Sequence, residues 1–177
     1  MAQTNEAPTV QVRPFQPEDE DAVVSLWRRC ELVRPWNDPR KDIGRKLRVR
    51  PDLFLVGLLG AQIVATAMAG YEGHRGWLNY VAVAPEHQRL GLGRAIVKEA
   101  ERRLRAAGCP KINLQVRTAN DGAIEFYRRL GYAVDEVVSM GKRLEHDALD
   151  QKARGQPPPD TRHVDDRASG FLPRPLV

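Results

Sequence analysis

Short stretches of alternating apolar and polar residues recur along the chain, which is the pattern of β-strands with one buried face. The first of them is Val10-Gln11-Val12-Arg13. Two apolar runs at residues 53–56 and 63–68 flank Gly60-Ala61-Gln62, so a β-hairpin is predicted there. Four more strands are predicted at about residues 77–83, 111–116, 132–134 and 137–144.

Apolar residues at intervals of three and four predict four helices between these strands. The first follows Gln16, has a proline and acidic residues in its opening turn, and ends near Cys30. Asp38-Pro39 has the form of an N-cap followed by a proline at N1, and starts the second helix. The third and fourth helices are predicted at about residues 94–107 and 119–130, and a glycine follows each of them.

The length of 177 residues indicates one domain, which we place at residues 9–147. Residues 1–8 lack the basic region and apolar core of a signal peptide and are interpreted as a flexible leader. Residues 148–177 are rich in proline and charge, so an extended or disordered C-terminal tail is expected. No apolar stretch approaches the ~20 residues that span a bilayer. We therefore expect a cytoplasmic protein with no membrane partner.

The net charge of +5 suits either nucleic acid or an anionic small ligand. Arg102, Arg103 and Arg105 are interleaved with Glu99 and Glu101 on one predicted helix, which is typical of a solvated face. No basic stripe contains interleaved aromatic residues, so nucleic-acid binding is not expected. The two cysteines have no metal-ligand spacing, and we expect two free thiols and no metal.

A glycine-rich stretch at residues 88–94 separates the strand predicted at residues 77–83 from the helix that follows. Its glycines let the main chain approach a ligand closely, and the free N–H groups of the first helical turn face an anion. Arg89 and Arg94 add positive charge beside this turn. The sequence therefore predicts a ligand that carries a phosphate or pyrophosphate.

Two common nucleotide-binding loops do not fit this stretch. A Rossmann site has a third glycine and an acidic residue at the end of the next strand, and residues 88–116 contain neither feature. A P-loop needs Gly-Lys-Ser or Gly-Lys-Thr, which is absent. Predicted antiparallel hairpins also precede the loop, which differs from the strand order of both folds.

The motif order resembles the GNAT family of N-acetyltransferases. The run Gln88-Arg89-Leu90-Gly91-Leu92-Gly93-Arg94-Ala95 matches the family pattern Q/R-x-x-G-x-G/A, and the resemblance covers about residues 9–145. A narrower likeness to bacterial YpeA-type acetyltransferases lies in residues 32–39, 70–76 and 108–112. The supporting motifs around the glycines are Val81-Ala82-Val83-Ala84-Pro85, Asn120, Ala123, Phe126-Tyr127 and Leu130-Gly131-Tyr132.

This resemblance implies an α/β (α+β) fold with a mixed, mostly antiparallel sheet of about seven strands and about four flanking helices. It also implies a splay between strands four and five that admits the pantetheine arm of acetyl-CoA, the cosubstrate. The cofactor-binding residues implied by the match are Val81, Ala82, Val83, Gln88, Arg89, Leu90, Gly91, Leu92, Gly93, Arg94, Asn120, Ala123 and Tyr127.

Direct attack of an amine on a thioester raises two proton problems. An alkyl amine with a pKa of about 10.4 must lose a proton, and the departing thiolate must gain one. The resemblance implies that Tyr127 is the general acid, while a core aromatic role is the alternative. Glu72 and His74 are the candidates for a base, and a mechanism with no dedicated base also stays open. A relay water has possible partners in Asn79, Tyr80 and Asn113.

The acceptor is expected to bind at the segment that joins the first two helices, through Arg34, Trp36 and Asn37, together with Glu72 and Arg75. An arginine suits a substrate carboxylate and an acidic residue suits a cationic amine, so a small metabolite, an amino acid and a peptide all stay open. The alternative function is a non-catalytic acyl-CoA-binding sensor or interaction module on the same fold. A monomer or a homodimer is expected.

Overall fold

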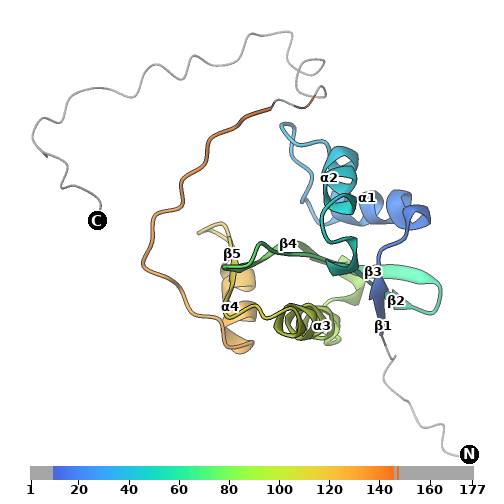
Figure 1. Ribbon diagram of the computed structural model, residues 1–177. Helices are drawn as coiled ribbons and strands as arrows, with labels where there is room; N and C mark the ends of the chain where they lie inside the picture. The colour runs from blue at the N-terminus through green and yellow to red at the C-terminus, as the bar shows by residue number, and fades with distance from the viewer. Residues whose placement is uncertain (1–9, 146, 148–177) are drawn as a thin grey trace, which may run out of the picture.

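The computed structural model describes residues 10–145 and 147, so the predicted leader and the predicted tail lie outside the described residues (Figure 1). The described part contains five strands and four α-helices, and three single turns of 3-10 helix link them. The strands are β1 (Gln11–Pro14), β2 (Phe54–Leu59), β3 (Gln62–Tyr71), β4 (Gly76–Val83) and β5 (Ile112–Leu114). The helices are α1 (Glu20–Arg29), α2 (Pro39–Leu47), α3 (Leu92–Ala106) and α4 (Asp121–Arg129).

The strands form one sheet in the order β1-β2-β3-β4-β5. The first three pairings are antiparallel and β4 pairs with β5 in parallel, so the predicted mixed, mostly antiparallel sheet is confirmed. Helices α1 and α2 cover one face of the sheet, and α3 and α4 cover the other (Figure 1).

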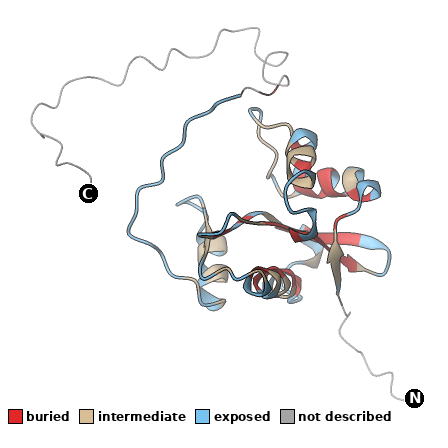
Figure 2. Ribbon diagram, in the orientation of Figure 1, coloured by how far each residue is buried: buried red, intermediate tan, exposed pale blue. Residues whose placement is uncertain are grey.

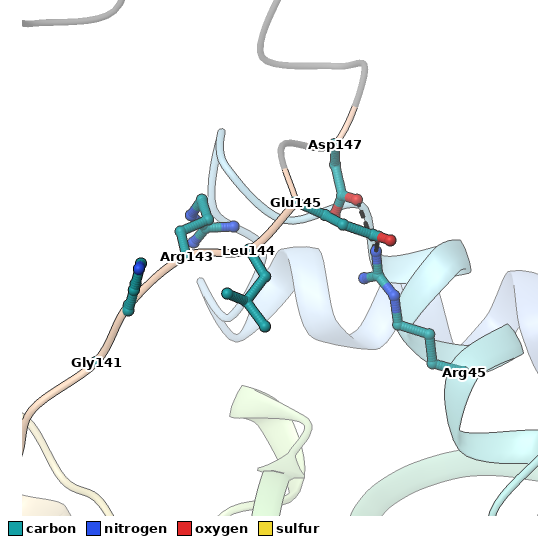
Figure 3. A pocket seen from close by; sticks show the side chains of 7 residues that line it. Arg45, Gly141, Arg143, Leu144, Glu145 and Asp147 are labelled. Carbon is teal, nitrogen blue, oxygen red and sulfur yellow. Dashed lines mark hydrogen bonds and ion pairs between the residues drawn. The ribbon is translucent and has the colours of Figure 1, made fainter.

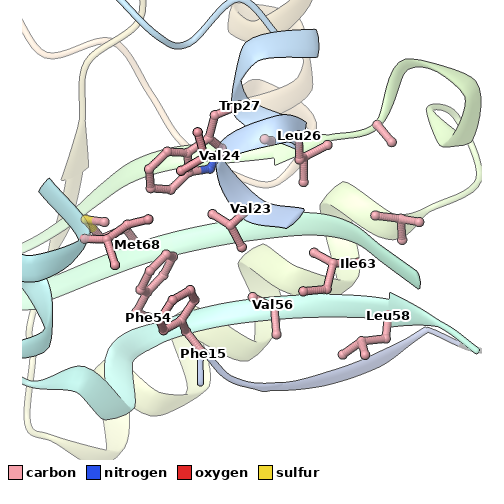
Figure 4. Close-up of a cluster of buried hydrophobic side chains, with 14 of the residues drawn as sticks. Phe15, Val23, Val24, Leu26, Trp27, Phe54, Val56, Leu58, Ile63 and Met68 are labelled. Atoms are coloured by element: carbon pink, nitrogen blue, oxygen red, sulfur yellow. The ribbon is translucent and has the colours of Figure 1, made fainter. Parts of the chain in front are cut away.

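Each face of the sheet has its own apolar core. On the α1 side, Trp27 stacks on Phe54 at 5.9 Å between ring centroids, and Phe15 stacks on the other side of Phe54 at 4.5 Å (Figure 4). On the opposite side, Ile96 and Leu104 of α3 pack with residues of β2, β3 and β4. These two cores hold β4 between helices, where its side chains reach both layers.

β4 separates from β5 part of the way along its length. The ladder between them pairs Gly76 with Ile112 and ends where Leu78 faces Leu114. Beyond this point Asn79, Ala82 and Val83 of β4 pair with β3 alone. The β3–β4 register shifts here, and Tyr80 has a φ of 49°, which marks a bulge. The predicted splay between strands four and five is therefore present.

The two strands predicted at residues 132–134 and 137–144 do not form, so the described sheet has five strands rather than about seven. The segment 132–145 is extended and mostly exposed, and it passes from α4 to the side of α2 (Figure 2). Its alternating apolar pattern is real, but no ladder pairs it with β5. The apolar side chains that it exposes are Val134, Val137, Val138, Met140 and Leu144.

Candidate functional site

The glycine-rich loop turns sharply into α3 and leaves its N-terminus open. Arg89 and Gly91 have φ values of 63° and 83°, and Gly91 is the N-cap of the helix. The first main-chain bond of the helix runs from the N–H of Ala95 to the carbonyl of Gly91 at 3.0 Å. Within the described chain, the N–H groups of residues 90–94 have no main-chain acceptor, which suits an anion.

The loop is also shaped for close approach. A Cβ atom at Gly93 would lie 3.2 Å from the ring of Phe126 and 3.5 Å from Val83, so only glycine fits without displacement. Arg89 and Arg94 are exposed beside the loop, and neither guanidinium has a hydrogen bond or ion pair to another described residue. Two cations are thus available to a phosphate at this helix start.

The part of β4 that has no pairing with β5, residues 79–83, leads to this loop. Val81 and Val83 are half-buried, and Ala82 is buried against the sheet core. The carbonyl of Val83 accepts the side-chain amide of Gln88 at 3.3 Å and the thiol of Cys30 at 3.4 Å. This carbonyl is therefore already engaged, while the edge of β4 before it faces the splay.

Helix α4 brings the third group of predicted residues to the splay. The Oδ1 of Asn120 caps the helix by accepting the N–H of Ala123 at 3.0 Å, so its amide N–H groups stay available to a ligand. Tyr127 packs edge-on to Phe126 at 5.0 Å and to Tyr132 at 5.5 Å. Burial raises the pKa of Tyr127 to about 12, and its hydroxyl has no hydrogen bond within the described chain.

The residues predicted as bases lie elsewhere. Glu72, His74 and Arg75 form the turn before β4, at the opposite end of that strand from the glycine-rich loop. The carboxylate of Glu72 accepts the N–H groups of His74 and Arg75 at 3.0 Å. These bonds lower the pKa of Glu72, which makes it a weaker base. The structure thus gives Glu72 a turn-stabilising role and does not bring it to the loop.

The predicted acceptor segment joins α1 to α2 and is bound by the C-terminal segment at residues 141–145 and 147. Arg143 donates to the carbonyl of Trp36 at 2.9 Å and to the side-chain oxygen of Asn37 at 3.3 Å. Trp36 is 38% exposed, and the guanidinium of Arg34 has no partner in the described chain. Asp38 is the N-cap of α2, as predicted, and accepts the N–H of Arg40 at 2.9 Å.

A cavity of about 740 Å³ lies between α2 and this C-terminal segment (Figure 3). Arg45 lines it and reaches Glu145 at 3.1 Å and Asp147 at 3.0 Å. Asp147 is buried and also accepts the N–H of Asp38 at 2.7 Å. These donors hold the pKa of Asp147 at about 2. Nothing in the sequence indicated this contact, because its partners are about 100 residues apart.

A second polar pair sits at the bulge of β4. The hydroxyl of Tyr80 donates to Oδ2 of Asp42 on α2 at 2.7 Å, and Arg45 donates to Oδ1 of the same carboxylate at 2.8 Å. The ring of Tyr80 stacks on Trp27 at 4.0 Å. The sequence predicts Tyr80 as a possible partner of a relay water, whereas the helical position of Asp42 carries no signal for this contact.

The described residues contain no group of three or more His, Cys, Asp or Glu side chains arranged to hold a metal ion. Cys30 and Cys109 are both free thiols, as predicted. Over the same residues, every helix falls short of the length and apolar character needed to cross a bilayer.

Comparison with known proteins agrees with this geometry. The family model described as "Acetyltransferase (GNAT) family" matches residues 20–132. An acetyltransferase of Pectobacterium atrosepticum is 46% identical over 138 residues, covering 78% of this chain and 98% of that protein. An acetyltransferase of Sodalis glossinidius is 46% identical over 139 residues, covering 78% of this chain and 98% of that protein.

Solved structures show the same fold. The PaiA N-acetyltransferase of Thermoplasma acidophilum, solved with coenzyme A, has a TM-score of 0.66 and 17% identity, and covers 73% of this chain and 93% of that chain. Naa20 of Chaetomium thermophilum, solved with a bisubstrate analogue, has a TM-score of 0.57 and 28% identity, and covers 70% of this chain and 71% of that chain.

Proposed function

The chain belongs to the GNAT family of acetyltransferases, and from that premise we propose that it transfers the acetyl group of acetyl-CoA to a primary amine by direct attack. The proposal rests on the way one edge of β4 continues into the start of α3. The unpaired edge of β4, at residues 79–83, leads directly into the open N-terminus of α3. An extended ligand arm with a pyrophosphate at one end fits this path.

Acetyl-CoA supplies the activated thioester in this reaction. The N–H groups of residues 90–94 would hold its pyrophosphate, with Arg89 and Arg94 as additional donors. The main chain of Val81 would bond the pantetheine amides in the manner of an added strand, and Asn120 would donate its free amide N–H to the same arm. The absence of a side chain at Gly93 leaves room for the ring of Phe126, which would lie 3.2 Å from a Cβ atom at this position.

Tyr127 is the proposed general acid for the departing sulfur. Its hydroxyl is uncommitted within the described chain, so it can donate a hydrogen bond to a ligand. The hydroxyl is protonated at neutral pH, as that of any tyrosine is, and burial, which raises its pKa to about 12, makes it a weaker acid than an exposed tyrosine. A departing thiolate whose conjugate thiol has an ordinary pKa of about 8.5 needs only a weak acid nearby.

The proposed acceptor is a primary amine of a small metabolite, an amino acid or a peptide. It would approach through the segment that joins α1 to α2, where Trp36 is exposed and Arg34 has no partner in the described chain. Arg34 suits an acceptor that carries a carboxylate. The proposal also includes a monomer or homodimer as the working form and the cytoplasm as its location.

An acceptor screen tests this function. The purified protein is mixed with acetyl-CoA and with amino acids, polyamines or peptides that have a free amino terminus, and the release of free thiol is measured. We expect turnover with at least one class, and a melting temperature that rises with acetyl-CoA concentration. A rise without turnover on any amine would favour the acyl-CoA sensor instead. No rise at millimolar acetyl-CoA would refute both functions.

The role of Tyr127 is tested separately. Tyr127→Phe keeps the ring that packs on Phe126 and Tyr132 but removes the hydroxyl. We expect kcat to fall by about 10²-fold, while the melting shift caused by acetyl-CoA stays as in the wild type. The matched control is Tyr132→Phe. The hydroxyl of Tyr132 donates to Glu101 at 3.1 Å, and we expect its removal to leave kcat nearly unchanged. A Tyr127→Phe protein with wild-type kcat would exclude the general-acid role.

A further inference from the structure

Two tyrosines flank the splay from opposite faces of the sheet. Tyr127 packs with the cluster on the α3 and α4 face, together with Val81 and Leu114. Tyr80 packs with the cluster on the α1 and α2 face and lies two residues beyond Leu78, where the β4–β5 ladder ends. The acetyl donor and its acceptor amine would therefore meet between these two side chains.

The two hydroxyl groups differ in what they can still do. The O–H of Tyr80 is committed to Asp42 at 2.7 Å, so its oxygen can offer only a lone pair to another ligand. The O–H of Tyr127 has no acceptor in the described chain and can donate. The splay thus has a hydrogen-bond acceptor on the α2 face and a donor on the α4 face.

Asp42 is held in the orientation that makes Tyr80 an acceptor. Arg45 takes its Oδ1 at 2.8 Å and leaves Oδ2 for the tyrosine. The other arm of Arg45 pairs with the buried Asp147, so the guanidinium cannot easily turn away. The bulge itself is fixed as well, because Thr66 donates to the carbonyl of Tyr80 at 2.8 Å and accepts the indole N–H of Trp27 at 2.9 Å.

A second unused acceptor lies on the same face. Ile112 and Leu114 of β5 pack on the α3 side, so Asn113 between them points to the α2 side by strand alternation. Its Oδ1 is buried and has no hydrogen-bond partner among the described residues. Buried polar atoms are nearly always paired, so this oxygen calls for a donor from a ligand or a water.

We propose that Tyr80, oriented by Asp42, accepts the proton of the acceptor amine, and that this face of the splay binds a primary amine as a hydrogen-bond donor. The inference rests on the proposed acetyltransferase function. Asp42 acts through Tyr80 and is a positioning residue that also receives the relayed proton.

The proton steps balance. As the amine nitrogen forms its bond to the acetyl carbon, the N–H proton passes to the oxygen of Tyr80, whose own proton passes to Asp42. The C–S bond breaks, and the sulfur takes the proton of Tyr127. Solvent then removes the proton from Asp42 and returns one to Tyr127, so the net change is transfer of the acetyl group with one proton from nitrogen to sulfur.

The sharpest variant is Asp42→Asn. Arg45 can bond only an acceptor atom, so it takes the new amide oxygen and turns the amide N–H groups toward Tyr80. The tyrosine then accepts from the amide and directs its O–H at the splay, which reverses its polarity. Asp42→Asn is therefore expected to be at least as damaging as Tyr80→Phe. A purely structural role predicts the opposite order, because asparagine preserves the shape.

Both variants are assayed with the most active amine of the acceptor screen at saturating acetyl-CoA. We expect kcat/KM for the amine to fall by about 10²-fold in each, with no further loss in the double variant. The melting shift with acetyl-CoA should match the wild type. Calorimetric titration of the same amine into the complex with coenzyme A, a readout without turnover, should show weaker binding for Asp42→Asn. Matched controls are Tyr71→Phe, whose hydroxyl bonds two turn carbonyls at 3.1 Å, and Asp52→Asn, whose carboxylate pairs with Arg50.

The outcomes separate cleanly. If Asp42→Asn keeps more than about half of the wild-type kcat/KM, this proposal is overturned and the acetyltransferase function is left standing. If Asp42→Asn shows no cooperative melt, the kcat/KM of Tyr80→Phe is used instead, and a value above about half of the wild type overturns the proposal. Loss of the melt in both variants assigns the pair to folding and overturns the proposal. A wild-type protein that acetylates no amine in the screen refutes the proposed function itself.

Discussion

At Gly93 a single methyl group tests the shape of the proposed cofactor surface. Gly93→Ala would place a Cβ 3.2 Å from the ring of Phe126, so the ring must shift beside the proposed cofactor surface. We expect the melting shift with acetyl-CoA to shrink by at least half in differential scanning fluorimetry. The control is Gly60→Ala in the turn between β2 and β3, where no atom lies within 4 Å and a φ of 57° imposes only backbone strain of about 1 kcal/mol. A normal shift in Gly93→Ala would show that the surface tolerates this bulk.

Single residues also show what the sequence could predict. Asp38 and Pro39 were correctly placed at the start of α2, because a cap depends only on its near neighbours. Glu72 lies in the turn after β3, where its carboxylate accepts N–H groups two and three residues away, and its role as a base stays a prediction. The contact between Asp42 and Tyr80 joins residues 38 apart on different elements, so no local pattern reveals it.

Among the elements, the bulge of β4 depends on one buried hydroxyl. Thr66 bonds both the indole N–H of Trp27 and the carbonyl of Tyr80. Thr66→Val keeps the shape but leaves these two groups unpaired, and we expect a loss of about 1–3 kcal/mol in the free energy of unfolding. Urea denaturation measures it. Val64→Ala removes only apolar volume at a buried position nearby on β3, and should lower stability while keeping kcat, whereas Thr66→Val should lower both.

The elements differ in how far sequence determines them. The four helices were predicted to within a few residues, because their apolar faces and caps are local. The strand pattern at residues 132–144 was also present, but a strand forms only against a partner edge. In the structure, side chains alone tether this segment beside β5, through Lys111 to Asp135 at 2.6 Å. Its C-terminal part is instead anchored on α2.

That anchor has a pH dependence of known sign. The pKa of Asp147 is lowered from its usual value near 3.9 to about 2, so its stabilising contacts exist above about pH 4 and are lost as the pH falls toward 2. Asp147→Asn should therefore be less stable than the wild type at pH 7, and the gap should narrow below pH 4. Urea midpoints at several pH values measure this. Glu145→Gln is the control, because Glu145 is exposed although it bonds the same Arg45.

For the molecule as a whole, the proposed reaction places one reactant on each side of the sheet. Helices α3 and α4 supply the glycine-rich loop and Tyr127 on one face, and α2 supplies Asp42 to the bulge on the other (Figure 1). In that proposal the reactants meet where β4 leaves β5, beyond the pair of Leu78 with Leu114. The sequence predicted this architecture through family resemblance, while the polarity of the two faces emerges only from contacts between distant residues.

The net charge of +5 should attract an anionic cosubstrate. Arg89 and Arg94 are exposed, so part of their attraction is screened as ionic strength rises, with a Debye length of about 8 Å near 0.15 M. We expect acetyl-CoA affinity to fall between 50 and 500 mM salt as a rough working range. In the Arg89→Ala/Arg94→Ala double variant it should be weaker at low salt and less salt-dependent. Calorimetric titration with acetyl-CoA measures both, with Arg102→Ala/Arg105→Ala on the far part of α3 as the charge-matched control. An equal loss in that control would assign the effect to overall charge rather than to the loop.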